Sequence, residues 1–346
     1  MSVSDYFALC LGDPEHGYYK TREPFGVAGD FTTAPEISQL FGEIIGIFLV
    51  LAWQSHGKPA PVRLIEIGPG RGTLMADIQR VVSSLAPDLA RTATAHLVET
   101  SEHLSAIQKK TLGGPAIATS WHTHVDDVPA GFTLLVSNEL FDAIPIRQFV
   151  MTDEGLRERV IAIGEGNKLA FQAGTATIDA PKWAKKAKSG DILEMAPARE
   201  ALMARIAERI VNNGGIALTI DYGHTRSALG DTLQAVSRHR FADVLANPGE
   251  CDLTSHVDFE ALGAAAHAEG AHIWPVMGQG EFLLALGLLE RAGTLGANKS
   301  VETQQLIRQS VERLAGDGDN QMGNLFKVLC IAGSPASIAP FATGNG

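Results

Sequence analysis

The sequence contains little cysteine, few aromatic residues and no excess of positive charge. Its three cysteines, Cys10, Cys251 and Cys330, lie far apart and form no C-x-x-C pair, so we expect reduced thiols in a reducing compartment. Lysine and arginine number 28 against 39 aspartate and glutamate residues, which gives a net charge of −11 over 346 residues. Because attraction to phosphates needs clustered basic side chains, this balance argues against a nucleic-acid partner. An acidic chain can still attract a basic protein substrate.

The chain also lacks targeting, membrane and metal motifs. No basic segment followed by an apolar core stands at the start, so no signal peptide is expected. The most apolar early stretch, residues 44–53, is too short to span a bilayer and is interpreted as a buried helix. No H-E-x-x-H motif occurs, and His122 and His124 are interpreted as loop histidines, so no metal is expected. We expect a protein of the cytoplasm, or one that is soluble in an organelle after processing.

The most informative segment is residues 63–73, Arg-Leu-Ile-Glu-Ile-Gly-Pro-Gly-Arg-Gly-Thr. An apolar strand runs into a turn with glycine at every second position, Gly68, Gly70 and Gly72, and a helical pattern follows. Glycines at such a turn let the backbone approach a bound cofactor closely. A dinucleotide fingerprint would place the third glycine one position later. The spacing found here, with Glu66 before it, is similar to the S-adenosylmethionine loop of class I methyltransferases.

Strands alternate with helices after this loop, which predicts an α/β fold with a doubly wound, Rossmann-like parallel sheet. Strands are expected near residues 63–67, 96–99, 115–119, 133–137, 216–220, 272–276 and 325–331, and helices over 74–85, 102–110 and much of 291–323. Residues 1–60 are expected to form a helical lead-in, in which Pro35 occupies the first turn of a helix. Gly42 and Gly46 on that helix predict close helix packing.

Two segments break the alternation. Residues 147–190 show period-two patterning with glycine and asparagine between the runs, which predicts a small antiparallel sheet inserted after the fourth strand. Residues 225–258 include a polar stretch with proline and glycine and predict a long loop. The expected organisation is a lead-in and lid over residues 1–60, followed by one Rossmann-like domain over residues 61–346.

Acidic and amide side chains follow several predicted strands. Glu66 and Glu99 end the first and second strands, Asn138 and Glu139 follow the fourth, and Asp221 ends the fifth. Ligands of open parallel sheets bind outside the carboxyl ends of the strands, so these groups are expected at one edge. An acid after the second strand is placed to accept hydrogen bonds from ribose hydroxyls.

Each of these positions also has an ordinary structural interpretation. Glu99 could be a solvated strand end, and Asn138 and Glu139 could cap a following helix. Asp221 could be a turn residue, and Asp142 could be an acid on a helix surface. That all of these interpretations hold together is much less plausible than that some of the residues form a site.

The chain resembles the MidA-type methyltransferases, a family that includes the mitochondrial complex I assembly methyltransferase. The resemblance rests on residues 17–43, which include Gly29-Asp30-Phe31-Thr32-Thr33-Ala34-Pro35-Glu36, on residues 66–72, on Asn138-Glu139-Leu140-Phe141-Asp142-Ala143-Ile144-Pro145, and on residues 221–223 and 252–259. It covers nearly the whole chain.

The resemblance implies a class I methyltransferase fold with S-adenosyl-L-methionine as cofactor. It implies methyl transfer to an arginine of the 49 kDa-type subunit of respiratory complex I, in support of complex I assembly. Mitochondrial members, which act in the matrix, carry a presequence, whereas this chain starts at the shared region. A bacterial, cytoplasmic member is therefore expected.

The candidate site has two parts. The expected cofactor-binding residues are Asp30, Thr33, Glu36, Glu66, Gly68, Gly70, Gly72, Glu99 and Asn138, with residues 29–36 folding over the cofactor as part of a lid. An arginine acceptor is planar and always protonated, so carboxylates must hold its charge away from the attacking nitrogen. Glu139 is the candidate clamp, with Asp221 or Asp142 assisting; Asp30 and Glu36 are further acids in range.

Three other functions stay open on the sequence alone. A nicotinamide-dependent oxidoreductase would need the G-x-G-x-x-G spacing, which is absent. A methyltransferase could act on another acceptor, although no strong basic patch favours RNA. A non-catalytic assembly factor could retain the fold, but the acids and glycines of the first two strand ends argue against a degenerate site. The oligomeric state is also open, with a homodimer as one alternative.

Overall fold

A computed structural model describes residues 1–21, 33–114, 117–237 and 240–341 of the chain. The chain divides into two compact units. Unit 1 comprises Met1–Phe31, Phe141–Leu202 and His224–Leu262, and unit 2 comprises Thr32–Leu140, Met203–Gly223 and Gly263–Gly346. The loop and most of the predicted site residues belong to unit 2.

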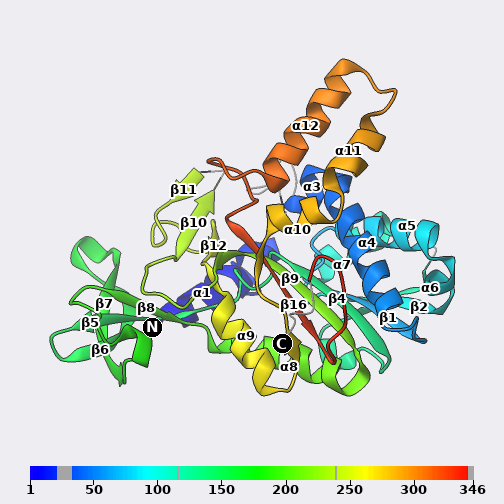
Figure 1. Cartoon of the computed structure of the whole chain (residues 1–346). Coiled ribbons are helices and arrows are strands. Elements are labelled where there is room, and N and C mark those ends of the chain that lie inside the picture. The colour runs from blue at the N-terminus through cyan, green and yellow to red at the C-terminus, as the bar shows by residue number, and fades with distance from the viewer. Residues whose placement is uncertain (22–32, 115–116, 238–239, 342–346) are drawn as a thin grey trace. The chain divides into compact units, whose positions relative to one another are not determined.

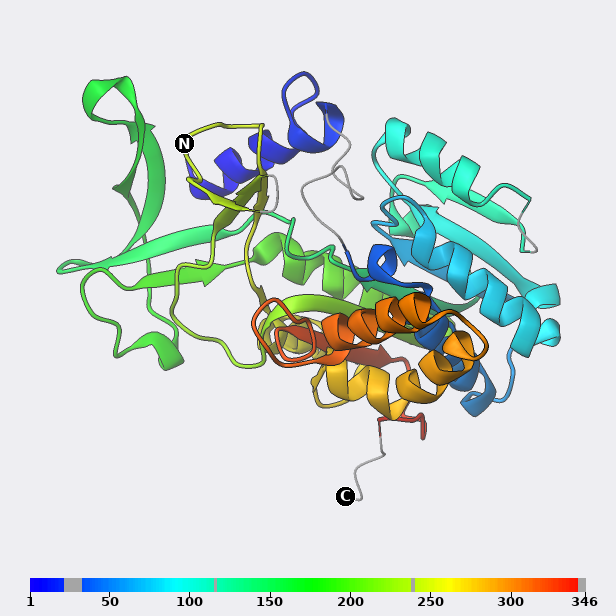
Figure 2. The ribbon, with the colours of Figure 1, turned by 90° about the horizontal axis from the view of Figure 1, so that it is seen from above.

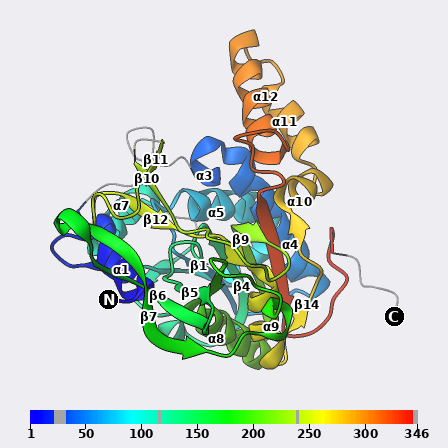
Figure 3. The same cartoon turned by 90° about the vertical axis from the view of Figure 1, so that its left-hand side faces the viewer.

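The central sheet lies in unit 2 (Figures 1 and 3). Its strands follow the order β14 (His272–Ile273), β16 (Phe326–Ala332), β9 (Gly215–His224), β4 (Phe132–Asn138), β1 (Val62–Ile67), β2 (Ala93–Val98) and β3 (Thr119–His122), with β15 (Met277–Gly278) also beside β16. The strands from β9 to β3 are parallel, as predicted. The third strand begins later than expected, at Thr119.

The last strands depart from the predicted parallel arrangement. β16 runs antiparallel to β9, and β14 and β15 run antiparallel to β16. The register pairs Phe326 with Tyr222, so the chain enters β16 at the carboxyl end of β9 and has to run backwards along it. A strand parallel to β9 would have required the chain to cross back first to the amino end of β9.

The order of the strands places a ligand edge in unit 2. β1 is central, with β2 on one side and β4 on the other, so the chain order reverses there. β1, β4 and β9 are almost entirely buried, as expected for parallel strands covered on both faces. The carboxyl ends of β1, β2 and β4 therefore form the edge where open α/β sheets bind ligands.

The helices of unit 2 are α3 (Ala34–Ile37), α4 (Gln39–Ser55), α5 (Thr73–Leu85), α6 (Pro87–Thr92), α7 (Glu102–Thr111), α10 (Gln279–Ala285), α11 (Leu288–Gly296) and α12 (Val301–Ala315), with the short helix η1 at Val125–Asp127. α11 and α12 lie side by side as a hairpin (Figures 1 and 2). Two further helices, α8 (Pro197–Asn213) and α9 (Phe259–Ala268), carry residues of both units. Within the described ranges, no helix is both long and apolar enough to cross a membrane.

The helix expected from Pro35 onward is two helices, α3 and α4, separated at Ser38. The Ser38 backbone is extended, and its hydroxyl accepts a hydrogen bond of 3.3 Å from the Leu40 amide. Serine is a favoured N-cap, so it starts a new helix at this point. The break ends α3 after a single turn and gives α4 its own N-terminus.

The predicted close packing at Gly42 and Gly46 is confirmed, with α5 as the partner helix. A Cβ atom on Gly42 would lie 2.5 Å from Cβ of Asp77, and one on Gly46 would lie 2.9 Å from Cβ of Val81. Neither distance is sterically tolerable, so glycine sets how closely α4 and α5 approach. The apolar residues of α4 join β1, β4 and β9 in one buried cluster.

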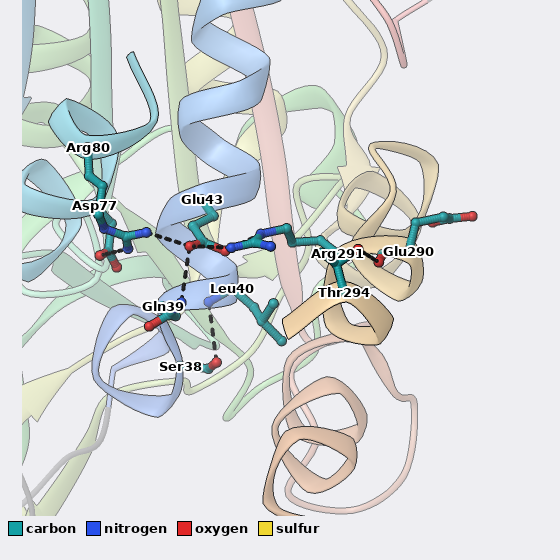
Figure 4. Close-up of polar contacts among 9 residues, drawn as sticks. All are labelled: Ser38, Gln39, Leu40, Glu43, Asp77, Arg80, Glu290, Arg291 and Thr294. Carbon is teal, nitrogen blue, oxygen red and sulfur yellow. Dashed lines mark hydrogen bonds and ion pairs between the residues drawn. The ribbon is translucent and has the colours of Figure 1, made fainter. Parts of the chain in front are cut away.

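A buried carboxylate ties three helices of unit 2 together (Figure 4). Glu43 of α4 accepts hydrogen bonds from Arg291 of α11 at 2.6 and 3.0 Å, from Arg80 of α5 at 2.5 Å and from Gln39 at 3.1 Å. Burial alone would raise the pKa of Glu43, but the two guanidinium groups bring this pKa below its ordinary value. The charge is therefore compensated within the protein.

Unit 1 contains α1 (Val3–Gly12), α2 (Tyr18–Thr21) and two antiparallel sheets. The first sheet, β7 (Leu169–Ile178), β6 (Gly155–Ile163), β5 (Arg147–Thr152) and β8 (Ile192–Met195), is the predicted insertion, shown in green in Figure 2. The second is β11 (Arg240–Ala242), β10 (Gln234–Ser237) and β12 (Asp252–Thr254). The remaining short elements are η2 (Glu165–Asn167), η3 (Lys182–Ala184) and β13 (Val257–Asp258).

The second small sheet differs from the long loop expected over residues 225–258. Its strands have three or four residues each, too few to show a period-two pattern in a polar sequence. Leu253 and Ala235 pair across it and are buried in the core of unit 1. Packing by a few apolar side chains fixes these strands.

Substitution of Gly42 by alanine tests the helix contact. We expect Gly42→Ala to lower the free energy of unfolding by roughly 1–3 kcal/mol, because the new methyl group overpacks against Asp77. The matched control is Gly293→Ala in α11, where nothing lies within 4 Å of the new Cβ, and a gain of about 0.5–1 kcal/mol is expected. Urea denaturation measures both, and equal effects would contradict the packing argument.

Candidate active site

The glycine loop after β1 has a backbone that only glycine adopts readily. Gly68, Gly70 and Gly72 have φ values of +68°, +51° and +83°. The Gly68 amide donates to the Val98 carbonyl at 3.1 Å, which joins the loop to the end of β2. A Cβ atom on Gly68 would lie 2.9 Å from Cδ1 of Leu140. The predicted turn is thus present, and α5 begins directly after it at Thr73.

Glu66 lies under this loop and is only 3% exposed. Burial raises the pKa of Glu66 to about 8, although a hydrogen bond from the Met75 amide in the first turn of α5 acts in the opposite direction. Its Oε2 atom has no hydrogen-bond partner among the residues the structure describes. Buried polar atoms are nearly always paired in native proteins, so this oxygen is a candidate contact for a ligand.

Glu99 directly follows β2, at the same edge as the loop. Its Oε1 atom accepts from the Ser101 amide at 2.7 Å, and its Oε2 atom accepts from Nε2 of Gln108 at 3.1 Å. Gln108 also donates to the Gly70 carbonyl at 2.8 Å. The Glu99 carboxylate is therefore held by hydrogen bonds at both oxygens and is not a freely solvated strand end. Gln108 is not predictable from the sequence, because nothing in a ten-residue amphipathic helix distinguishes one glutamine.

Asn138 and Glu139 end β4 in a strained turn. Glu139 has a φ of +50°, which is unusual for a residue other than glycine, and its amide donates to the Ile220 carbonyl at 2.9 Å. Its Oε1 atom accepts from Nδ2 of Asn138 at 3.0 Å and from the Ala34 amide at 3.1 Å. Within the described residues, Oδ1 of Asn138 is buried without a partner. The alternative of a cap for a following helix is wrong, since the capped amide belongs to α3.

Helix α3 brings Glu36 to the loop, and Thr33 directly precedes the helix. Thr33 is the N-cap of α3 through its backbone, with no side-chain cap bond. Oε1 of Glu36 accepts from the Thr73 hydroxyl at 2.5 Å, and Oε2 of Glu36 lies 3.7 Å from Nη1 of Arg71. Glu36 therefore contacts both the loop and the start of α5. Asp30 and Phe31 lie outside the described residues.

Asp221 lies inside β9, which continues to His224. The alternative of a turn residue is therefore wrong, and the reason is the pairing of this segment with β16, where Lys327 lies opposite Asp221. Asp221 is fully buried, and its Oδ1 atom accepts from the Tyr222 amide at 2.9 Å. The last residue pair between β4 and β9 is Asn138 with Ile220. The next residues on the two parallel strands are Glu139 and Asp221, which therefore take neighbouring places at this end of the sheet.

Asp142 belongs to unit 1 and is 5% exposed, so it is not an acid on a helix surface. Its carbonyl accepts from Nη2 of Arg199 at 3.0 Å and from the Ser255 amide at 3.2 Å. Arg199 is itself buried and also donates to the carbonyls of Ile144 and His256. This arginine, which the sequence analysis did not single out, holds the segment that follows Glu139 within unit 1.

One histidine assignment needs correction. His122 lies in β3 and not in a loop, and its Nε2 atom is 2.9 Å from Nδ1 of the buried His96 on β2. Burial lowers the pKa of His96 to about 4, with a further contribution from His122. His124 precedes η1 as its N-cap. Among the described residues, no group of three or more His, Cys, Asp or Glu side chains is arranged to hold a metal ion.

Comparison with known proteins identifies the family. Residues 44–276 match the family described as "Putative S-adenosyl-L-methionine-dependent methyltransferase". The protein arginine methyltransferase NDUFAF7 homolog of Drosophila melanogaster is 34% identical over 95% of this chain and 80% of its own length. The human protein arginine methyltransferase NDUFAF7 is 35% identical over 89% of this chain and 75% of its own length.

A solved structure gives the same answer for the fold. A Burkholderia thailandensis protein crystallised with S-adenosyl-homocysteine aligns with a TM-score of 0.85 and 26% identity, over 99% of this chain and 92% of that chain. A native structure from the same organism aligns with a TM-score of 0.82. Together with the glycine loop at the ligand edge, these matches establish that the chain belongs to the S-adenosyl-L-methionine-dependent methyltransferase family.

Proposed function

We propose that this methyltransferase modifies an arginine side chain of a protein substrate. The observation that carries the proposal is a pair of acids on neighbouring strands: Glu139 directly follows β4, and Asp221 directly follows Ile220, the last residue of β9 that pairs with β4. They are separate from Glu66 and Glu99, which stand at the ends of β1 and β2. Several relatives at 33–35% identity are named protein arginine methyltransferases, and they support the same acceptor.

The residues of the edge fit S-adenosyl-L-methionine. The proposed cofactor-binding residues are Thr33, Glu36, Glu66, Gly68, Gly70, Gly72, Glu99 and Asn138, with Asp30 retained as a prediction. Oε2 of Glu66 and Oδ1 of Asn138 have no partner within the part of the chain that the structure describes, so each can bind a polar group of the cofactor. The glycine backbone of the loop allows the cofactor to approach closely. When bound, the cofactor supplies an activated methyl group, so the protein has mainly to position the two reactants.

The acceptor sets the second requirement. A guanidinium is planar and always protonated, and one of its nitrogens must become the nucleophile. A carboxylate that binds the other nitrogens holds the positive charge away from the reacting atom. We assign this role to Glu139, whose side chain is anchored by Asn138 and the Ala34 amide, with Asp221 assisting. A contribution from Asp142, which belongs to unit 1, stays a prediction.

We further propose a respiratory complex I subunit of the 49 kDa type as the acceptor, in a bacterial cytoplasm, so that the modification supports complex I assembly. The net charge of −11 suits a basic segment of such a substrate. The test is transfer of labelled methyl groups in an extract lacking this protein, followed by mass spectrometry of the labelled band. Label on a lysine, on RNA or on a small molecule would contradict the proposal.

The variant Glu139→Gln tests the clamp. We expect at least a hundredfold loss of methyl transfer, because the amide cannot hold the guanidinium charge. The affinity for S-adenosylhomocysteine, measured by calorimetry, should stay within about threefold of wild type. Asp221→Asn and Asp142→Asn show which second acid assists. Full activity of Glu139→Gln would remove Glu139 from the proposed mechanism.

The raised pKa of Glu66 predicts a pH dependence of cofactor binding. Below about pH 8 the carboxyl group holds a proton, and a cationic ligand group would favour the carboxylate, so binding releases the proton. Affinity for S-adenosylhomocysteine should therefore rise with pH toward about 8, and this rise should be lost in Glu66→Gln. The number of protons released is measured by calorimetry, from how the observed binding enthalpy changes between buffers of different ionisation enthalpy.

The folding stability of the ligand-free protein should change with pH in the opposite direction to its affinity for the cofactor. The folded pKa of Glu66 lies above its ordinary value of 4.5, so the buried carboxyl group costs stability as pH rises from 4.5 toward about 8. Wild type should thus lose stability relative to Glu66→Gln over this range, as measured by denaturant titration. Parallel curves for the two proteins would contradict the buried, protonated state.

A further inference from the structure

Gln108 is a buried amide that connects three parts of unit 2. It lies on α7 and is fully buried. Its Nε2 atom donates to the Gly70 carbonyl at 2.8 Å and to Oε2 of Glu99 at 3.1 Å, and its Oε1 atom accepts from Nε1 of Trp121 on β3 at 3.0 Å. One side chain therefore contacts the loop after β1, the acid after β2 and an aromatic residue of the edge strand.

The partners fix the orientation of this amide. An indole N–H can only donate, so the amide oxygen of Gln108 must face Trp121. The NH₂ group then faces the Gly70 carbonyl and the Glu99 carboxylate, both of which accept. The reverse orientation would set two acceptors against the amide oxygen and leave the indole unpaired, at a cost of about 1–3 kcal/mol for each buried group.

The loop also packs against the aliphatic part of the Gln108 side chain. Gly72 packs on Gln108, where a Cβ atom on the glycine would lie 3.4 Å from Cγ of the glutamine. Gly70 itself has no side chain with which to anchor the loop. The hydrogen bond from the Gln108 side-chain amide therefore supports the loop from the β2 side. Glu36 of α3 supports the other end of the loop through its hydrogen bond with Thr73.

We propose that Gln108 is a positioning residue for the cofactor, oriented by Trp121. It holds Glu99 and the Gly70 carbonyl at a fixed separation, so that the acid and the loop meet the ribose end of the cofactor together. The inference rests on the proposed role of Glu99 in binding the ribose hydroxyls. A carboxylate oxygen accepts more than one hydrogen bond, so the anchoring bond from Gln108 leaves Glu99 able to bind a diol.

The test compares cofactor affinity with turnover. For Gln108→Leu we expect about a tenfold or greater loss of affinity for S-adenosylhomocysteine in calorimetry, as for loss of a buried hydrogen bond that orients a binding group. For Trp121→Phe, which keeps an aromatic ring but removes the donor, we expect a smaller loss. Turnover at saturating cofactor should be unchanged in both variants, because neither residue is assigned to the acceptor.

The matched control is Gln279→Leu. Gln279 is equally buried, and its amide donates to the Leu314 carbonyl at 2.8 Å, away from the loop. We expect the two glutamine variants to lose similar stability in urea denaturation, whereas only Gln108→Leu loses cofactor affinity. Equal affinities for the two variants would reduce Gln108 to a structural residue and overturn the proposal.

An analogue of S-adenosylhomocysteine without the ribose hydroxyls separates this inference from the function on which it rests. If Gln108 acts through Glu99, the affinity lost in Gln108→Leu should largely disappear with the 2′,3′-dideoxy analogue. An undiminished loss would overturn the coupling to Glu99. If wild type itself binds both ligands equally, the ribose assignment of Glu99 fails first. If wild type discriminates but Gln108→Leu binds as wild type does, only the role of Gln108 fails.

Discussion

The turn after β1 is the constraint on which the site depends. Three glycines in left-handed conformations allow the chain to leave a buried strand and enter α5 within five residues. Such a turn has no side chains to hold its shape. Its support comes from hydrogen bonds with neighbouring residues. Glu66 accepts one from the first turn of α5, Gln108 donates one to the Gly70 carbonyl, and Glu36 accepts one from the Thr73 hydroxyl. The loop thus owes its order to polar groups that also form the edge of the sheet.

Two equally buried glutamates show how a structural acid differs from a binding acid. Glu43 accepts hydrogen bonds from two arginines and a glutamine, and its pKa falls below the ordinary value. Among the described residues, Glu66 receives one backbone amide and keeps an unpaired oxygen, and its pKa is raised to about 8. Desolvation raises the pKa of both groups, and only Glu43 has guanidinium partners that reverse this shift. A protein that leaves a buried carboxyl group short of partners retains stability to be gained when a ligand binds.

The sequence predicted the elements whose signal is local. The glycine spacing located the loop, and strand ends located Glu66, Glu99 and Glu139 on one edge, because parallel strands share a direction. Signals that depend on tertiary partners were missed. The reversal of β16, the continuation of β9 through Asp221, and the pairing of His122 with His96 each depend on which strand lies alongside. Gln108 and Arg199 acquire their roles from carbonyl groups distant in sequence.

The strained turn at Glu139 follows from the same geometry. The amide of Glu139 still bonds β9, while its φ of +50° ends the run of β4, and the chain then enters unit 1. A backbone of this kind persists only where surrounding contacts enforce it. Here the Ala34 amide and the Asn138 side chain bind the Glu139 carboxylate. Because Ala34 begins α3 and α3 also bonds the glycine loop through Glu36, one short helix joins the proposed acceptor acid to the cofactor loop.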